Sequence, residues 1–194
     1  MTAAANLATS IGLGAWQRAG VVTPLIIEQG KLGAAYFSPC HRYRYLLTRG
    51  APDAKRRVTF VMLNPSTADS DRNDPTVAKC IKFAAREATA RGWEAHRVAI
   101  VNLYAIRATD PRDCFADQKP VGGAINDGAI LETCANSEIV IAAWGSHQKA
   151  SGRAREIRGM LDGIVLYRLG PSTKDGSPRH PLYLRDVTPL EEWV

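Results

Sequence analysis

Two short segments, far apart in the chain, carry polar side chains of the kinds that bind ligands and take part in catalysis. An apolar run over residues 59–63 ends in Asn64-Pro65-Ser66-Thr67, which places an amide and two hydroxyls directly after a candidate strand. Near the other end, residues 179–184 are Arg-His-Pro-Leu-Tyr-Leu. Open α/β sheets bind their ligands where strands end. We therefore expect residues 64–67 to belong to a ligand site, and His180 to be a candidate partner in it.

The elements that must position these residues follow from hydrophobic periodicity. The expected strands cover residues 58–63, 97–103, 139–144 and 165–169, and the expected helices cover residues 76–91, 125–135 and 153–161. Alternating strands and helices predict an α/β fold: a three-layer sandwich with a central, mostly parallel four-stranded sheet and helices on both faces. Shorter runs at residues 25–27, 34–37 and 43–48 predict an N-terminal antiparallel edge.

Every expected strand of the parallel sheet ends in polar or aromatic residues. These ends are Asn64, Asn102, the segment Trp144-Gly145-Ser146-His147, and the loop 170–180. Because parallel strands end at the same edge of a sheet, the sequence predicts a single pocket at this edge.

Length and charge limit the possible classes of protein. The chain has 194 residues, 45% of them hydrophobic, and a formal net charge of +6. This size predicts one domain over residues 21–194, after a flexible arm over residues 1–20. The positive charge favours a polyanionic partner such as DNA. No segment reaches the roughly 20 apolar residues of a membrane span, so we expect a cytoplasmic protein.

Cofactor sites have no clear signal in the sequence. Neither a Gly-x-Gly-x-x-Gly nor a Walker pattern occurs, so we expect no nucleotide cofactor. The four cysteines, Cys40, Cys80, Cys114 and Cys134, form no Cys-x-x-Cys pair and are expected to be reduced, although a cluster built from all four stays open. Asp69, Asp71 and Asp74 could in principle hold Mg²⁺, but Asp74-Pro75 is typical of a helix start. We expect no metal.

The motifs LNPSTAD, NDPT, VNLYAIR, AAWG and GxPRHPLYL resemble those of a bacterial family catalogued only as a domain of unknown function, over residues 42–184. The order of the loops is also similar to that of the uracil-DNA glycosylase superfamily. That resemblance assigns Asn64 to positioning the hydrolytic water, Asn102 to the pyrimidine's Watson–Crick edge, and His180 to the departing base. Because an amide cannot deprotonate water, Asp69 is expected to supply negative charge, with Asp74 as an alternative.

The same resemblance extends to the substrate. Uracil-specific members have a bulky Tyr where this chain has Ser66, so a small residue here predicts room for a substituent at C5 of the base. Tyr104 and Trp144 are the candidate stacking partners. Leu182, Tyr183 and Leu184 are the candidate wedge for base flipping. Lys174, Ser177 and Arg179 are the candidate DNA contacts. Three arginines of the expected helix at 153–161 are possible additions: Arg153, Arg155 and Arg158.

The resulting hypothesis is a metal-independent DNA glycosylase that removes a C5-modified or mismatched pyrimidine from DNA and leaves an abasic site, in repair or in antiviral defence. One alternative is a non-catalytic nucleic-acid or nucleoside-binding domain on the same fold, and another is an enzyme of free nucleosides. Structural roles also stay open: a turn at Asn64, loop contacts for Asn102 and His180, and a core position for Trp144.

Overall fold

The computed structural model describes residues 25–117 and 120–194. Its strands are β1 (Ile26–Gln29), β2 (Ala34–Phe37), β3 (Arg44–Gly50), β4 (Arg56–Met62), β5 (His96–Asn102), β6 (Ile139–Ala142), β7 (Leu166–Leu169) and β8 (Leu190–Glu192). Its helices are α3 (Pro75–Ala90), α4 (Pro111–Ala116), α5 (Ala124–Ala135) and α6 (Ser151–Met160), with short 3₁₀ turns η1 (Gln148–Ala150) and η2 (Pro181–Tyr183). The flexible arm expected over residues 1–20 lies outside the described residues.

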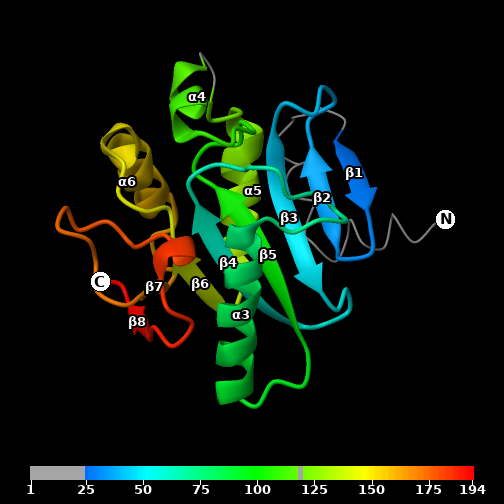
Figure 1. The fold of residues 1–194 in the computed structure, drawn as a ribbon, viewed down its shortest axis with the longest axis vertical. Helices are drawn as coiled ribbons and strands as arrows, with labels where there is room; N and C mark the ends of the chain where they lie inside the picture. Colours follow the sequence, from blue (N-terminus) through cyan, green and yellow to red (C-terminus); the bar gives the residue numbers. More distant parts are fainter. Residues whose placement is uncertain (1–24, 118–119) are drawn as a thin grey trace.

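The strands of the described chain form one eight-stranded mixed sheet in the order β1-β2-β3-β5-β4-β6-β7-β8 (Figure 1). Pairs β5·β4, β4·β6 and β6·β7 are parallel, and the other pairs are antiparallel. The predicted four-stranded, mostly parallel sheet is therefore wrong, although its expected strands exist as β4, β5, β6 and β7.

The error in the fold prediction has a physical origin. An apolar run shows that a strand is buried, but it does not show which strand completes the hydrogen bonds along its edge. The outer edge of β5 is completed by β3, where Leu47 pairs with Ile100, so the first three strands extend the same sheet. The outer edge of β7 is completed by β8, whose three residues are too few to show strand periodicity.

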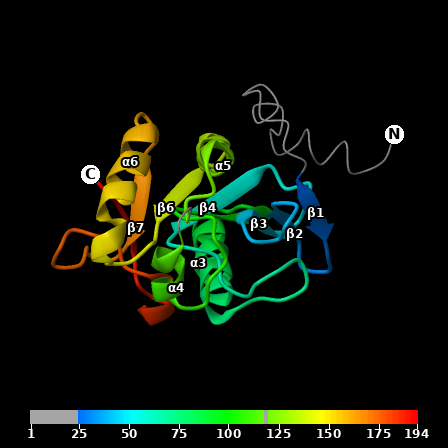
Figure 2. The same cartoon turned by 90° about the horizontal axis from the view of Figure 1, so that it is seen from above.

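Helices pack on both faces of the sheet, because neighbouring residues of a strand point to opposite sides. Phe60 of β4 packs in one core with Phe83 of α3. Its neighbour Val61 packs in the other core with Ile130 of α5 and Ile157 of α6. Figure 2 shows α5 and α6 on one side of the sheet and α3 on the other. The two cores fix where α3 and α6 begin relative to the ends of the strands.

The start of α3 is set by its capping residue. Asp74 has an extended backbone and accepts a hydrogen bond from the amide of Val77 at 2.8 Å, and Pro75 follows at the first helical position. Both features are typical of a helix N-terminus. The helix therefore begins close to the carboxyl end of β4.

The short helix α4 was not predicted. Six residues are too few for an apolar repeat, and its cap, Asp110, accepts from the amide of Arg112 at 2.8 Å. None of the helices in the described ranges is long and apolar enough to cross a bilayer.

Candidate functional site

A cleft of about 690 Å³ lies where the parallel strands end. Its walls come from the ends of β4 and β5, the N-terminus of α3, the segment after β6, and the loop that leads into η2. Nine of the predicted site residues line it: Asn64, Ser66, Asn102, Trp144, Arg179, His180, Leu182, Tyr183 and Leu184. The two segments that are most distinctive in the sequence thus lie in one cavity.

Asn102 is the last residue of β5 and lies beside Met62 in the parallel register. Only 1% of its surface is exposed, and neither its amide nitrogen nor its amide oxygen has a hydrogen-bond partner. An unpartnered buried amide costs about 1–3 kcal/mol, so such groups need an explanation. Because Asn102 also lines the cleft, its amide is a candidate group for binding a ligand there.

The backbone next to Asn102 is held from the opposite face of the sheet. Asn126 of α5, which is fully buried, donates to the carbonyls of Asn102 at 3.0 Å and Leu103 at 3.3 Å. Arg153 of α6 donates through Nε to the Leu103 carbonyl at 3.0 Å. These bonds fix the chain at the end of β5, and so help to orient the Asn102 side chain.

The sequence had suggested Arg153 as an additional DNA contact, but the side chain is buried instead of exposed. Its side chain is 5% exposed and forms ion pairs with Asp127 and Glu156. Asn126 was missed because an Asn within a helical pattern has no distinctive signal of its own.

Asn64 follows β4 and lines the cleft. Its amide nitrogen donates to the carbonyl of Ala108 at 2.7 Å and to that of Pro65 at 3.0 Å. An amide nitrogen has two hydrogens, so both are used, and only the oxygen Oδ1 is left to bind a further group. That oxygen can accept a hydrogen bond from a water, but it cannot donate one.

His180 caps η2 and lines the cleft. Its Nδ1 accepts from the amide of Leu182 at 3.4 Å, so a neutral ring carries its proton on Nε2. Burial lowers the pKa of His180, and the negative charge of Asp74 opposes this shift. The lowered pKa favours the neutral ring near pH 7, with Nε2–H as a hydrogen-bond donor.

Gly145 makes room for His180. Its φ of +77° lies in the left-handed region, and a Cβ atom at this position would lie 3.2 Å from the Cβ of His180. Glycine is the residue that tolerates both the conformation and the close approach. The Trp144-Gly145 sequence is thus a steric requirement for the position of the imidazole.

Two further charged residues line the cleft, of which the sequence had suggested only Asp74, as an alternative to Asp69. Asp74 lines it in addition to capping α3. Arg44, 2% exposed, also lines it, donates through Nη1 to the Ala68 carbonyl at 2.8 Å, and has a buried Nε without a partner. Burial lowers the pKa of Arg44 to about 10, with Asp74 opposing, so the side chain stays positively charged at pH 7. A lone Arg within an apolar strand was the available signal.

Asp69 does not line the cleft. Its Oδ1 accepts from the amides of Asp71 and Arg72, and its Oδ2 forms an ion pair with Arg72 at 3.0 Å. The Asn-Pro-Ser-Thr-Ala-Asp segment turns away after Ser66 and Thr67, which removes Asp69 from the carboxyl edge. In the described part of the chain, the carboxylate of the cleft is that of Asp74.

Other predicted residues also lie elsewhere. Tyr104 donates from its hydroxyl to the Lys149 carbonyl at 3.2 Å and does not line the cleft. Trp144 does line it, but is 4% exposed and packs edge-on against Trp193 at 5.4 Å, so a core role and a site role coexist. Lys174 and Ser177 are also outside the lining. The loop that holds them is closed by Asp175, which accepts from Ser146, Thr173 and Ser177.

The metal alternatives have little support in the geometry. Asp71 accepts from the amide of Lys31 at 2.9 Å, away from Asp74. Cys80 packs against one face of the sheet, and Cys114 and Cys134 against the other. Within residues 25–117 and 120–194, no three His, Cys, Asp or Glu side chains are grouped so that they could hold a metal ion.

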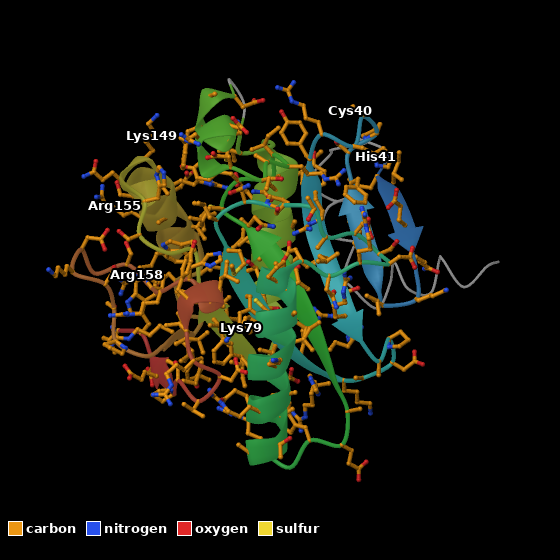
Figure 3. All side chains as sticks on the ribbon, viewed as in Figure 1. Cys40, His41, Lys79, Lys149, Arg155 and Arg158 are labelled. Atoms are coloured by element: carbon orange, nitrogen blue, oxygen red, sulfur yellow. The ribbon has the colours of Figure 1, made fainter. Side chains whose placement is uncertain are left out.

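Cationic side chains are exposed at the rim of the cleft and beyond it. Arg179 is exposed and uses Nε to bind the Pro171 carbonyl at 2.9 Å, which leaves its outer nitrogens free of that contact. Figure 3 shows Lys149, Arg155 and Arg158 on the α6 side of the molecule, and all three are exposed. Arg158 lies over the ring of Trp193 at 4.7 Å. This distribution suits contacts with an anion larger than the cleft itself.

Comparisons with known proteins agree with the resemblance to an uncharacterised family. No curated protein and no solved structure matches the chain. A family model, described as protein of unknown function (DUF1643), matches residues 44–182. This span covers well over half of the chain and runs from Arg44 to Leu182, two residues that line the cleft. The chain therefore belongs to the DUF1643 family of proteins of unknown function.

Proposed function

We propose that the protein is a DNA glycosylase that hydrolyses the N-glycosidic bond of a flipped pyrimidine. The observation that carries this proposal is the cleft of about 690 Å³, in which the unpartnered amide of Asn102 lies together with Asn64 and His180. The proposal also rests on the resemblance of the loop order to the uracil-DNA glycosylase superfamily. The volume is in the range of small-molecule sites and can admit a single nucleobase.

Asn102 is the proposed base-reading group. Its amide offers a donor and an acceptor side by side, and both lack a partner in the protein. Pyrimidines present a matching acceptor and donor on their Watson–Crick edge, so a bound base would satisfy both atoms of the amide. This pairing accounts for the otherwise unfavourable burial of Asn102.

His180 and Arg44 are proposed to stabilise the departing base. Cleavage of the bond between C1′ and the ring nitrogen leaves its electron pair on the base, where negative charge gathers on O2. A neutral imidazole with Nε2–H can donate to that oxygen, while the buried guanidinium of Arg44 makes the cleft electropositive. A preorganised donor in a site with little water is worth more than the same donor in solvent.

Asn64 and Asp74 are proposed to act on water. Asn64 can accept a hydrogen bond only through Oδ1, which would hold one water hydrogen. Asp74 supplies the carboxylate that an amide cannot replace. In the reaction the water oxygen forms a bond to C1′, the bond from C1′ to the base breaks, and the water proton passes to the Asp74 carboxylate. The products are an abasic site and the base anion, which takes up a proton from solvent, while Asp74 returns its proton to solvent.

Ser66 makes a C5-substituted base the favoured substrate. The side chain is small, lines the cleft, and stands where uracil-specific members of the resembled superfamily have a bulky Tyr. A cavity without that obstruction can hold a pyrimidine with a substituent at C5. Genome repair and defence against a virus with modified DNA would both use such an enzyme.

The mouth of the cleft has features suited to DNA. Tyr183 is 83% exposed and Leu182 is 37% exposed, although both are large apolar residues beside a polar cavity. Exposed apolar side chains of this kind can fill the gap left by a flipped base. Arg179, exposed at the same mouth, is suited to a flanking phosphate.

The direct test uses duplex oligonucleotides that contain uracil, a mismatched thymine, or cytosine with a hydroxymethyl or larger C5 group. After incubation with the protein, abasic sites are detected by alkaline cleavage of the strand, and the released base is identified by mass spectrometry. We expect release from a C5-modified or mismatched duplex. Release should be reduced at least about 100-fold in Asn102→Ala and His180→Ala.

Matched controls separate the site from general effects on the fold. Asn136→Ala removes an exposed Asn at the end of α5, and His41→Ala removes a His at the opposite end of the sheet from α6 (Figure 3). Both should keep the activity. Salt-sensitive DNA binding without base release would instead support a binding domain, and turnover of free nucleosides alone would support a nucleoside enzyme.

A further inference from the structure

A second cavity, of about 260 Å³, lies at the opposite end of the parallel strands from the cleft. It is bordered by Arg57 at the start of β4, Arg97 at the start of β5, and Arg49 near the end of β3. Arg57, which lines this cavity, and Met62, which lines the cleft, are five residues and roughly 16 Å apart on β4. Among the described residues, the lining of this second cavity contains no Asp or Glu.

Arg57 of β4 and Arg97 of β5 lie side by side in the sheet. Arg57 and Arg97 are direct partners in the parallel register, so their side chains leave the sheet on the same face. Like charges at directly opposed positions are unfavourable, and the burial of Arg57, which is 4% exposed, increases the cost. Consistently, burial lowers the pKa of Arg57, and the charge of Arg97 lowers it further.

Several hydrogen-bond donors at this place have no acceptor. Nη1 of Arg57 and Nε of Arg97 are buried and unpartnered, whereas Nη1 of Arg97 donates to the Pro52 carbonyl at 3.0 Å. The buried hydroxyl of Tyr36 is also unpartnered. Burial raises the pKa of Tyr36, and the charges of Arg57 and Arg97 oppose this shift. Arg49, by contrast, is fully engaged with Asn73 and with backbone carbonyls. Arg57 and Arg97, which both line the cavity, therefore form an incomplete site that needs an acceptor with negative charge.

The protein itself does not provide that acceptor in the cavity. Glu138 and Glu132 act electrostatically on Arg57, but neither lines the cavity. The residues outside the described ranges, 1–24 and 118–119, contain no Asp or Glu in their sequence. Of the residues that the structure describes, those lining the cavity therefore supply no carboxylate to the two arginines.

We propose that this second cavity binds an oxyanion of the phosphate type, held by Arg57 and Arg97. Paired guanidinium groups present planar sets of N–H donors that match the oxygens of a phosphate. The volume suits inorganic phosphate or the phosphate end of a mononucleotide, and a backbone phosphate of DNA has the same chemistry. The proposal does not depend on the glycosylase activity.

The test measures thermal unfolding of the full chain while inorganic phosphate is titrated at constant ionic strength against chloride. In the wild-type protein, the midpoint temperature should rise with the logarithm of the phosphate concentration once this exceeds the Kd, by about 3 °C or more in total. In Arg57→Gln and Arg97→Gln, titration calorimetry should give a Kd for phosphate that is at least about tenfold higher. Arg56→Gln is the matched control, because Arg56 is exposed, belongs to the same strand, and pairs with Glu138 instead of lining the cavity.

Other outcomes would overturn the proposal. These are no effect of phosphate on the wild-type protein, an equal effect on all variants, or loss of the effect in Arg179→Gln, which would place the ion in the cleft. If a Gln variant does not fold, Arg97→Lys keeps the charge but not the planar donor set, and should also bind at least about tenfold more weakly. Two further titrations, one with a mononucleotide and one with a short DNA duplex, identify the source of the phosphate. The ligand that binds Arg97→Gln more weakly than the wild-type protein is the one whose phosphate occupies this cavity.

Discussion

The side chain of Asn126 donates to the backbone carbonyl of Asn102 at 3.0 Å, while the side chain of Asn102 has no partner at all. The amide of Asn126 thus holds the end of β5, whereas the amide of Asn102 stays available for a ligand. The two residues lie on opposite faces of the same sheet, and their different bonding predicts opposite effects of mutation.

Asn102→Ala should change the free energy of unfolding by less than about 1 kcal/mol, because it removes two unsatisfied polar atoms, but should abolish base release. Asn126→Ala should destabilise the fold by about 1–3 kcal/mol, because it removes hydrogen bonds from a fully buried site. Chemical denaturation and the abasic-site assay measure the two effects. A large loss of stability in Asn102→Ala would show that its amide is bonded within the protein.

Gly145→Ala should reduce both stability and activity. A left-handed backbone costs a residue with a Cβ about 1–2 kcal/mol, and the new atom would also press against His180. Gly163→Ala is the matched control, since its φ of +82° is similar but nothing lies within 4 Å of the added atom. The denaturation midpoint of Gly145→Ala should be equal to or lower than that of Gly163→Ala, and only Gly145→Ala should lose base release. Equal activity in both would mean that the imidazole does not need this space.

His180 should make the stability of the fold depend on pH. Its pKa is lowered in the folded state by burial, so the unfolded chain takes up a proton more readily. The contribution is fully present above the unfolded pKa of about 6.5 and is lost as the pH falls toward the lowered folded value. His180→Asn, which keeps a side-chain acceptor for the cap, should remove this part of the slope. Denaturation series between pH 7.5 and 5 would contradict the interpretation if the two proteins had the same slope.

Asp74→Asn should retain the fold and lose activity. Asn caps helices about as well as Asp, so α3 should stay within about 1 kcal/mol of its original stability, whereas the proposed acceptor for the water proton is gone. A loss of roughly 100-fold in base release is expected. Asp69→Asn is the control, because that carboxylate binds Arg72 outside the cleft. If Asp69→Asn is the inactive variant, the assignment of the two carboxylates is reversed.

Ser66→Tyr should change the choice of substrate. A ring at this position would fill the space assigned to the C5 substituent, so release of a C5-modified base should fall by at least about tenfold relative to release of uracil. Competition between the two duplexes in one reaction gives this ratio directly. Ser66→Ala, which leaves the space open, should keep the original ratio.

Much of the site could be predicted because its residues stand at positions with local signals. Asn64 and Asn102 follow apolar runs, and His180 precedes a proline in a loop, so their placement at strand ends depends on short stretches of sequence. Arg44 was missed as a cleft residue because its place in a strand explains it locally, and Asp74 was named only as an alternative because its role as a helix cap explains it locally. Asp69 was expected at the site because it is close in sequence to Asn64, but closeness in sequence does not place its carboxylate in the cleft.

The sequence by itself determined the strands β4, β5, β6 and β7 and the helices α3, α5 and α6, because the period of the apolar residues reflects burial along each element. It also determined that polar groups stand at the ends of those strands. Only the tertiary structure decided that β3 and β8 complete one mixed sheet, which amides are already bonded, and which carboxylate enters the cleft. These features depend on contacts between residues distant in the chain, such as Asn126 with Asn102, and no local pattern encodes such a contact.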